Sequence, residues 1–420
     1  MKKAILLSLN SNTSELKDLA HSLEFEIVEE FIQHRPVPDS ALYMGKGKME
    51  EIRKFVEEKK IQYAFVNGDL RPSQWFNIEK FLGITVYDRI HLILEIFADR
   101  ARRKEARLQV KLARLRYERP FVRELIHRAK AGEHPGFMAG GEYQVADYYE
   151  MIKRQMRKLK KELEKIRRER EIRREQRREK GFYLVSLAGY TNAGKSSLLA
   201  ILTGEKVRIE ERLFSTLSPV TKMVKKWNEK MRIMPVLVTD TVGFIQDLPH
   251  WLVDAFHSTL EEIELADIVV LVVDASDEKD VMMNKLNVSL KEIAQMHVHP
   301  KIIIALNKID LISKEEVERK KEEIEKYADN KKCIPISSKT GENIHKLVEE
   351  IYKSIPEVVT LELTFPSGKI NDAITFLKKD VEVIDFKYDG TSKLCIKCSP
   401  RMKEKIMGKY RKLVGSENNG

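Results

Sequence analysis

The sequence predicts an α/β protein of several domains, the central one built on a doubly wound, mostly parallel sheet. Short apolar runs alternate with amphipathic helical stretches over much of the 420-residue chain. A turn of the form G-x-x-x-x-G-K-S stands between one such run and a helical segment. Upstream of that turn the composition shifts to basic helical sequence. We therefore expect a small α/β domain, a basic helical hairpin, a phosphate-binding domain and a small α+β appendix.

Composition limits the classes of protein to consider. Hydrophobic residues make up 42% of the chain and charged residues 34%, which is typical of a globular protein with a highly charged surface. The net charge is +11, so a polyanionic partner is expected, either nucleic acid or an anionic membrane face.

No segment predicts a membrane span or a disulfide framework. The longest apolar runs, such as 268–273, are far shorter than the roughly 18 residues that a span needs. The basic start Met1-Lys2-Lys3 precedes an apolar run too short for a signal peptide. Three cysteines in so long a chain fit a reducing compartment. We expect a cytoplasmic monomer, with peripheral membrane association left open.

Residues 1–98 form the first predicted domain. Strands are expected at 4–9, 25–31, 62–66 and 83–86, with helices between them. The turn Gly45-Lys46-Gly47 precedes a predicted helix over 49–59. Its lysines could contact a phosphate backbone, or the turn could simply start the helix.

Residues 99–180 predict a basic antiparallel hairpin. The helix expected over 101–118 carries leucines at seam spacing, and a second helix repeats that spacing from Ile152 to Ile166. The next seam positions are Arg170 and Arg173, so we expect the helix to continue into solvent there. Residues 151–180 hold 15 Lys and Arg against 6 Asp and Glu, a net +9. This charge predicts an anionic partner, although a solvated face is the simpler alternative.

Between the two helices, residues 132–143 contain several glycines and a proline. Such a composition disfavours regular structure, so we expect a mobile loop at the tip of the hairpin.

Residues 181–356 predict the phosphate-binding domain. A strand over 182–188 leads into the turn, and a helix begins near Ser197. Backbone N–H groups of such a turn converge at a helix N-terminus and hold polyphosphate, with the lysine reaching the β- and γ-phosphates. The predicted phosphate loop comprises Gly189, Tyr190, Thr191, Asn192, Ala193, Gly194, Lys195 and Ser196.

A second group of residues is expected to hold Mg²⁺ and the γ-phosphate. The strand over 234–239 ends in Asp240, Thr241, Val242 and Gly243, which places a carboxylate at the usual Mg²⁺ position and a glycine N–H near the γ-phosphate. Ser196 supplies a first hydroxyl ligand. The segment Phe214, Ser215, Thr216, Leu217 and Ser218 is the expected first switch, with Thr216 as second hydroxyl ligand and Thr221 as the alternative. Lys195, Thr216 and Gly243 are the predicted catalytic residues.

The nucleotide base is predicted from a third group. The strand over 301–306 ends in Asn307, Lys308, Ile309 and Asp310, the N-K-x-D pattern of guanine-specific enzymes. Asp310 can accept from guanine N1–H and the exocyclic amine, whereas adenine would leave the carboxylate unpaired. Ser337, Ser338 and Lys339 follow the apolar stretch 333–336 and match a loop that presents N–H to guanine O6. Together the motifs predict a P-loop GTPase domain with GTP as substrate and Mg²⁺ as cofactor.

Phe244 follows Gly243, where Ras-like enzymes place the glutamine that orients the attacking water. A phenyl ring cannot hydrogen-bond water. We therefore expect slow intrinsic hydrolysis, completed by a partner or by a polar group such as Gln246 or Asp247.

Residues 357–420 predict a β-α-β-β-α appendix, with strands at 358–365, 381–388 and 393–397 and helices at 371–379 and 401–413. Cys395 and Cys398 lie three positions apart on a predicted strand and so face opposite sides, which favours a structural role over a zinc site.

Taken together, the phosphate loop, the stretch Leu-Phe-Ser-Thr-Leu-Ser-Pro at 213–219 and the stretch 240–249 closely resemble the HflX family of translational GTPases. Upstream stretches at 43–48, 70–74, 86–97 and 108–113 also look like that family, so the resemblance covers about residues 1–355.

The resemblance implies a GTPase that binds the large (50S) ribosomal subunit, with its amino-terminal domain and hairpin near the peptidyl transferase centre, and that splits stalled ribosomes. One departure is the loop, where many members carry Gly-Pro-Gly-Glu-Thr-Gln and this chain has Met138 to Gln144 instead. A nucleotide-gated RNA-binding or ribosome-assembly module, with incidental hydrolysis, is the alternative. Binding to a membrane surface is a third reading, although no apolar face accompanies the charge.

Overall fold

The fold is known from a computed structural model that describes residues 1–130, 141–204, 219–224, 234–245, 249, 251–252, 257–296, 300–329, 331–365, 382–389 and 391–414. Contacts divide the chain into two compact units, each made of several stretches of sequence, and one boundary between them falls inside a long helix, between Ile166 and Arg167. Each unit has its own buried apolar clusters. In the described ranges, no helix combines the length and the apolar character that a bilayer crossing requires.

The first unit begins with a four-stranded parallel sheet in the order β2-β1-β3-β4. Its elements are β1 (Lys2–Ser8), α1 (Ser14–Ser22), β2 (Phe25–Ile32), α2 (Lys46–Lys59), β3 (Tyr63–Val66), α3 (Pro72–Leu82), β4 (Thr85–Asp88) and α4 (Arg89–Arg100). One apolar cluster joins this sheet to α2 and α3. Gly45 caps the start of α2 and donates its N–H to Gln33 Oε1 at 2.8 Å. In this structure the Gly-Lys-Gly turn therefore starts a helix.

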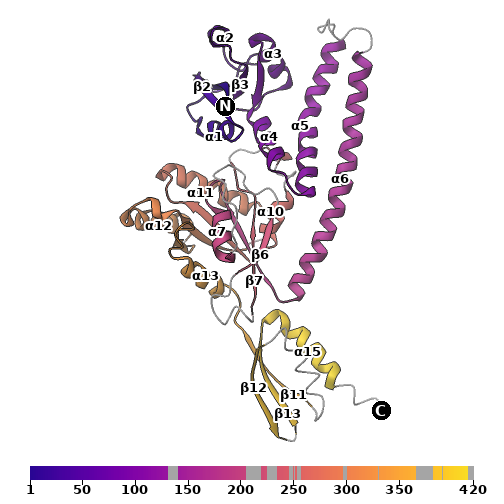
Figure 1. Cartoon of the computed structure of the whole chain (residues 1–420), viewed down its shortest axis with the longest axis vertical. Coiled ribbons are helices and arrows are strands. Elements are labelled where there is room, and N and C mark those ends of the chain that lie inside the picture. Colours follow the sequence, from indigo (N-terminus) through magenta and orange to yellow (C-terminus); the bar gives the residue numbers. More distant parts are fainter. Residues whose placement is uncertain are drawn as a thin grey trace. The chain divides into compact units, whose positions relative to one another are not determined.

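A hairpin of two long helices follows, α5 (Lys104–Lys130) and α6 (Gly141–Glu179). Figure 1 shows them side by side, and the predicted seam is present, since Leu112 and Leu115 form a buried cluster with Ile152, Met156 and Leu159. The α5 helix is longer than predicted and continues through Pro120. The α6 helix already begins at Gly141, so the last residues of the predicted loop, 141–143, are helical; residues 131–140 lie outside the described part.

The carboxy-terminal third of α6 corrects a second prediction. The expectation that α6 continues into solvent is wrong at Arg170, whose side chain is only 12% exposed. Arg174, one turn further on and not named in the prediction, is 7% exposed. Arg174 donates to Glu261 and Glu262, both buried on α10 (His257–Glu264). In this part of α6, buried arginines paired with carboxylates of α10 thus follow the apolar seam, whereas Arg173 is exposed, as predicted.

The second unit contains a six-stranded sheet in the order β10-β9-β8-β5-β7-β6, parallel except for β6. Its strands are β5 (Tyr183–Gly189), β6 (Val220–Met223), β7 (Val236–Asp240), β8 (Ile268–Asp274), β9 (Lys301–Asn307) and β10 (Cys333–Pro335). Its other helices are α7 (Lys195–Thr203), α11 (Lys279–Ala294), the short 3-10 helix η2 (Ile309–Leu311), α12 (Lys314–Tyr327) and α13 (Ile344–Lys353). Separate clusters bind α7 and α13 to one face and α10, α11 and α12 to the other. This is the predicted doubly wound arrangement, with central strands that are apolar on both faces.

The chain ends in a three-stranded antiparallel sheet of order β11-β13-β12 with one helix on it. Its elements are β11 (Val359–Phe365), β12 (Glu382–Asp389), β13 (Thr391–Cys398) and α15 (Pro400–Val414). The helix lies along one face of the sheet (Figure 1), where Phe365 and Cys398 are buried against Met402. Cys395 lies on the opposite face of β13 from Cys398. The predicted helix over 371–379 lies outside the described residues.

Candidate functional site

The phosphate loop joins the end of β5 to the start of α7, and two of its glycines are fixed by close backbone packing. Gly189 has φ of +141°, and a Cβ there would lie 2.3 Å from Val272 O. Gly194 has φ of +94°, and a Cβ there would lie 2.2 Å from Asn307 Nδ2. A side chain at either position would collide with a neighbouring strand, so the spacing of the motif follows from the packing.

Lys195 lies beneath this loop, with 7% of its surface exposed. Its ammonium donates to the carbonyls of Gly189 and Tyr190 at 3.1 and 2.8 Å. Burial lowers the pKa of Lys195 to about 8, and the nearby Asp240 carboxylate partly opposes this shift. An anion at the loop would favour the charged form of this lysine.

Ser196 and Asp240 meet at the first turn of α7. The Ser196 hydroxyl donates to Asp240 Oδ2 at 2.7 Å, and Asp240 is 1% exposed at the end of β7. A hydroxyl beside a carboxylate is an all-oxygen set of the kind that Mg²⁺ prefers. Thr241, the next residue, donates its hydroxyl to Leu187 O at 2.7 Å and fixes β7 against β5.

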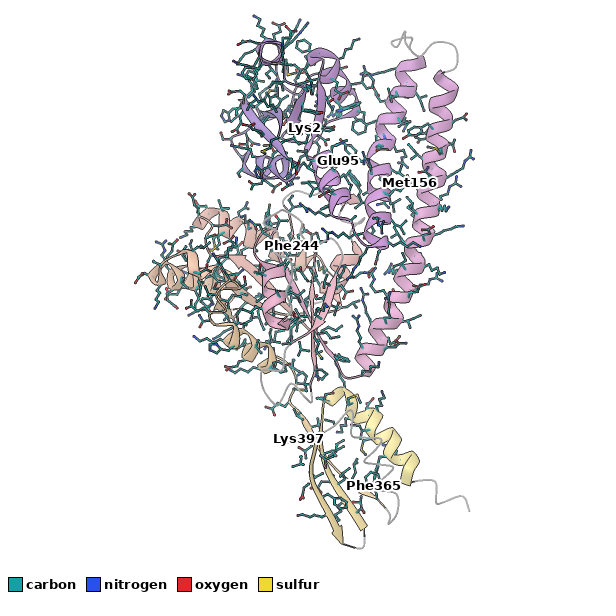
Figure 2. The ribbon with its side chains drawn as sticks, in the orientation of Figure 1. Lys2, Glu95, Met156, Phe244, Phe365 and Lys397 are labelled. Atoms are coloured by element: carbon teal, nitrogen blue, oxygen red, sulfur yellow. The ribbon has the colours of Figure 1, made fainter. Side chains whose placement is uncertain are left out.

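Gly243 and Phe244 contact the phosphate loop directly. A Cβ on Gly243 would lie 2.8 Å from Lys195 Nζ and 2.9 Å from Thr191 Cα, so only glycine fits. Phe244 donates its N–H to Gly189 O at 2.9 Å and accepts from Thr191 N–H at 3.0 Å. Its ring, labelled in Figure 2, is 6% exposed and belongs to the cluster that contains Ile263. In this conformation, the residue after Gly243 is therefore held by the loop and turned into the core.

The predicted base-recognition residues also converge. Asn307 Nδ2 donates to Ala193 O at 2.8 Å, while Asn307 Oδ1 accepts from Ser338 N–H at 2.9 Å. The Ser337 hydroxyl donates to Asp310 Oδ1 at 2.6 Å. Asn307 thus connects three loops that are far apart in the sequence. Ile309 and Lys339 follow β9 and β10, whereas Val242 follows β7.

The first switch cannot be placed in this way, because Phe214 to Ser218 lie outside the described residues, as do Gln246 and Asp247. The alternative ligand Thr221 is described. It pairs with Thr239 across β6 and β7, and the two hydroxyls lie 2.9 Å apart. Its hydroxyl therefore already has a partner within the sheet.

Sequence reasoning missed Asp274, the last residue of β8. Its carboxylate lies 2.5 Å from Lys308 Nζ in the predicted base-recognition motif. The available signal was a carboxylate directly after the apolar run 268–273, at the carboxyl end of a parallel strand.

This chain is similar to known GTP-binding proteins along most of its length. Residues 10–98 match the family described as "GTP-binding GTPase N-terminal", residues 100–177 match "GTP-binding GTPase Middle Region", and residues 184–308 match "50S ribosome-binding GTPase". A GTPase HflX from Thermofilum pendens is 40% identical over 83% of this chain and 82% of its own length. One from Methanocaldococcus jannaschii is 38% identical over 88% of this chain and 89% of its own.

Among solved structures, a crystal structure described as a complex of SsGBP and GDP is similar to this fold. The TM-score is 0.50 and the identity is 29%, over 84% of this chain and 98% of that one.

Proposed function

This chain belongs to the HflX family of GTPases, and we propose that it binds the large ribosomal subunit and uses its GTP cycle to split or rescue stalled ribosomes. Family membership makes it an enzyme that hydrolyses GTP. The observation that carries the ribosomal part is the match of its nucleotide domain to the "50S ribosome-binding GTPase" family, in a chain that also carries a basic hairpin.

In this proposal the converging loops hold GTP. Lys195 contacts the β- and γ-phosphates, and Gly243 offers its N–H to the γ-phosphate. Asp310 accepts from the guanine N1–H and amine, and the loop of Ser337, Ser338 and Lys339 would present a backbone N–H to guanine O6. The support is geometric, since one residue, Asn307, bonds both the phosphate loop and the loop at Ser338.

Mg²⁺ would be held by the Ser196 hydroxyl and, through water, by the Asp240 carboxylate, with Thr216 as the further ligand that the sequence predicts. Bound there, the ion stabilises negative charge that develops on the phosphates. The all-oxygen pair at 2.7 Å suits such an ion.

Slow intrinsic hydrolysis is part of the proposal. Phe244 offers no hydrogen bond to water from its side chain, and both its backbone groups are bonded to the phosphate loop. A partner must therefore supply or reposition the group that orients the attacking water. The ribosomal subunit is the proposed partner.

The basic hairpin is the proposed contact with ribosomal RNA. Its seam residues face inward, and Arg170 and Arg174 are largely buried against α10, but most of the other basic side chains described on α6 are exposed. Among the side chains of α6 that the structure describes, the exposed basic residues are Arg154, Arg157, Lys158, Lys160, Lys161, Lys165, Arg167, Arg168 and Arg173. Phosphate contacts of this kind give binding that falls steeply with salt.

Cosedimentation of the full chain tests this proposal. We expect binding to 50S particles that is stronger with a non-hydrolysable GTP analogue than with GDP. Replacing Lys158 and Lys161 by Gln should weaken binding to 50S particles. The fall of log K with log salt should become less steep, by about 0.7 to 0.9 for each phosphate interaction that the substitutions remove. Replacing Lys314 and Lys326, which are exposed on α12, is the matched control. Equal, nucleotide-independent binding to naked RNA would instead support the RNA-binding or assembly module.

A further inference from the structure

The ammonium of Lys308 is held by a residue that no motif includes. Lys308 Nζ lies 2.5 Å from Asp274 Oδ2, and the two side chains are 26% and 11% exposed. Asp274 ends β8 and Asn307 ends β9, and the two residues are direct partners across these parallel strands. The sheet register therefore places the carboxylate beside the start of the base-recognition motif.

Asp274 is itself fixed on its other oxygen. Oδ1 accepts from the backbone N–H of Ser276 at 2.9 Å and from its hydroxyl at 2.6 Å. One carboxylate oxygen is thus bonded to the turn after β8, and the other is bonded to the lysine. Because Ser276 fixes the Asp274 carboxylate, this carboxylate is a fixed partner for the Lys308 ammonium.

Neighbouring charges have partners of their own. Lys285 bonds both oxygens of Asp277, at 2.9 and 2.8 Å. Lys320 donates to the carbonyls of Ala275 and Asp277, and it pairs with Glu316 at 2.8 Å. Among these described groups, Asp274 and Lys308 thus make a separate pair.

The position of Lys308 makes this pair important for base recognition. Lys308 adopts a left-handed backbone conformation, with φ of +67°, and precedes Asp310 by two residues. The flexible side chain of Lys308 allows its ammonium to reach a nearby carboxylate. Asp310, two residues further along the chain, is such a carboxylate. A lysine bonded to Asp310 would compete with the guanine donors for the same oxygens.

We propose that Asp274 is a positioning residue for guanine selection, an inference that rests on the proposed binding of guanine at Asp310. By holding the Lys308 ammonium, Asp274 lays the apolar stem of that lysine along the base and keeps its charge away from Asp310. The Asp310 carboxylate, already oriented by Ser337, is then open to the N1–H and the exocyclic amine.

Nucleotide affinities of the full chain test this role. Asp274→Asn should weaken GDP binding about tenfold, and Lys308→Met should have an effect of similar size. Because both changes disrupt one ion pair, the double variant should bind GDP no more weakly than the single variant with the lower affinity.

A second measurement separates positioning from a structural role. IDP lacks the exocyclic amine, so the ratio of GDP to IDP affinity reports the Asp310 contact. This ratio should fall in Asp274→Asn, and partial unfolding cannot alter it, because both ligands see the same folded fraction. Asp280→Asn, an equal change of charge at an exposed position of α11, should leave the ratio unchanged.

Additive effects in the double variant, or an unchanged ratio in Asp274→Asn, would overturn the inference. A wild-type protein without preference for GDP over IDP would instead overturn the assignment of guanine to Asp310 itself. The two failures are therefore distinguishable in one set of titrations.

Discussion

Arg174→Met should locally destabilise the junction of α6 and α10. The guanidinium lies 2.7 Å from Glu262 and 3.3 Å from Glu261, and all three side chains are almost fully buried. Methionine keeps most of the volume but leaves buried carboxylates without that charge. Removing one partner of a buried ion pair costs about 3 to 5 kcal/mol. Arg167 and Arg170 still reach Glu261, at 3.2 and 3.8 Å, so the lower end of this range applies.

Native-state hydrogen exchange of the full chain measures this loss locally. A change of about 3 kcal/mol corresponds to amide exchange in α10 roughly a hundredfold faster. The control is Arg173→Met, since Arg173 is exposed and donates to Glu169 O within its own helix at 3.1 Å. Adding Glu261→Gln and Glu262→Gln to Arg174→Met should recover part of the protection, because the uncompensated charges disappear. Equal exchange in Arg174→Met and Arg173→Met would refute this reasoning.

Three further predictions concern the nucleotide site and the carboxy-terminal domain. Because the pKa of Lys195 is lowered to about 8, GDP binding should take up a proton above pH 8 and little at pH 7, seen as a buffer-dependent binding enthalpy in calorimetry. Gly194→Ala should abolish GDP binding in the same assay, since its Cβ would lie 2.2 Å from Asn307 Nδ2. Arg401→Met should speed hydrogen exchange in α15, because Arg401 donates to Phe182 O at 2.7 Å.

Each of these has a contradicting result. Identical binding enthalpies in all buffers at pH 9 would show that the lysine stays charged in the free protein. Gly194→Ala with wild-type affinity would mean that the loop relaxes around the added methyl group. In the third case, unchanged exchange in α15 would show that Arg401 does not anchor that helix.

The lowered pKa of Lys195 also makes the stability of the nucleotide-free protein depend on pH. The unfolded lysine has its ordinary pKa near 10.5, whereas the folded one titrates at about 8. Between these values the unfolded state binds more protons, so stability rises with pH across that window. Below pH 8 the folded protein bears the full cost of a buried charge.

Sequence reasoning located the nucleotide loops because their residues stand at fixed local spacings. Most of the described strands fall close to their predicted ranges, since apolar runs bounded by turns are local signals as well. The burial of Arg174 could not be predicted in this way, because its partner Glu262 lies 88 positions further along the chain. Periodicity reports that a position faces a neighbour but does not reveal whether that neighbour is apolar or acidic.

Asp274 shows the same limit at the site. The N-K-x-D pattern predicts Lys308 from one strand, whereas its partner is set by the register of the adjacent strand. Strand order and register are tertiary properties, so only the folded sheet brings this carboxylate to the lysine.

GTP turnover with and without purified 50S subunits tests the proposed function most directly. Because Phe244 cannot orient water and the subunit is the proposed partner, we expect turnover to rise at least about tenfold when 50S particles are added. The rise should fall with increasing salt, as phosphate contacts require. Turnover that is equally fast without ribosomes, or unchanged by them, would contradict the account.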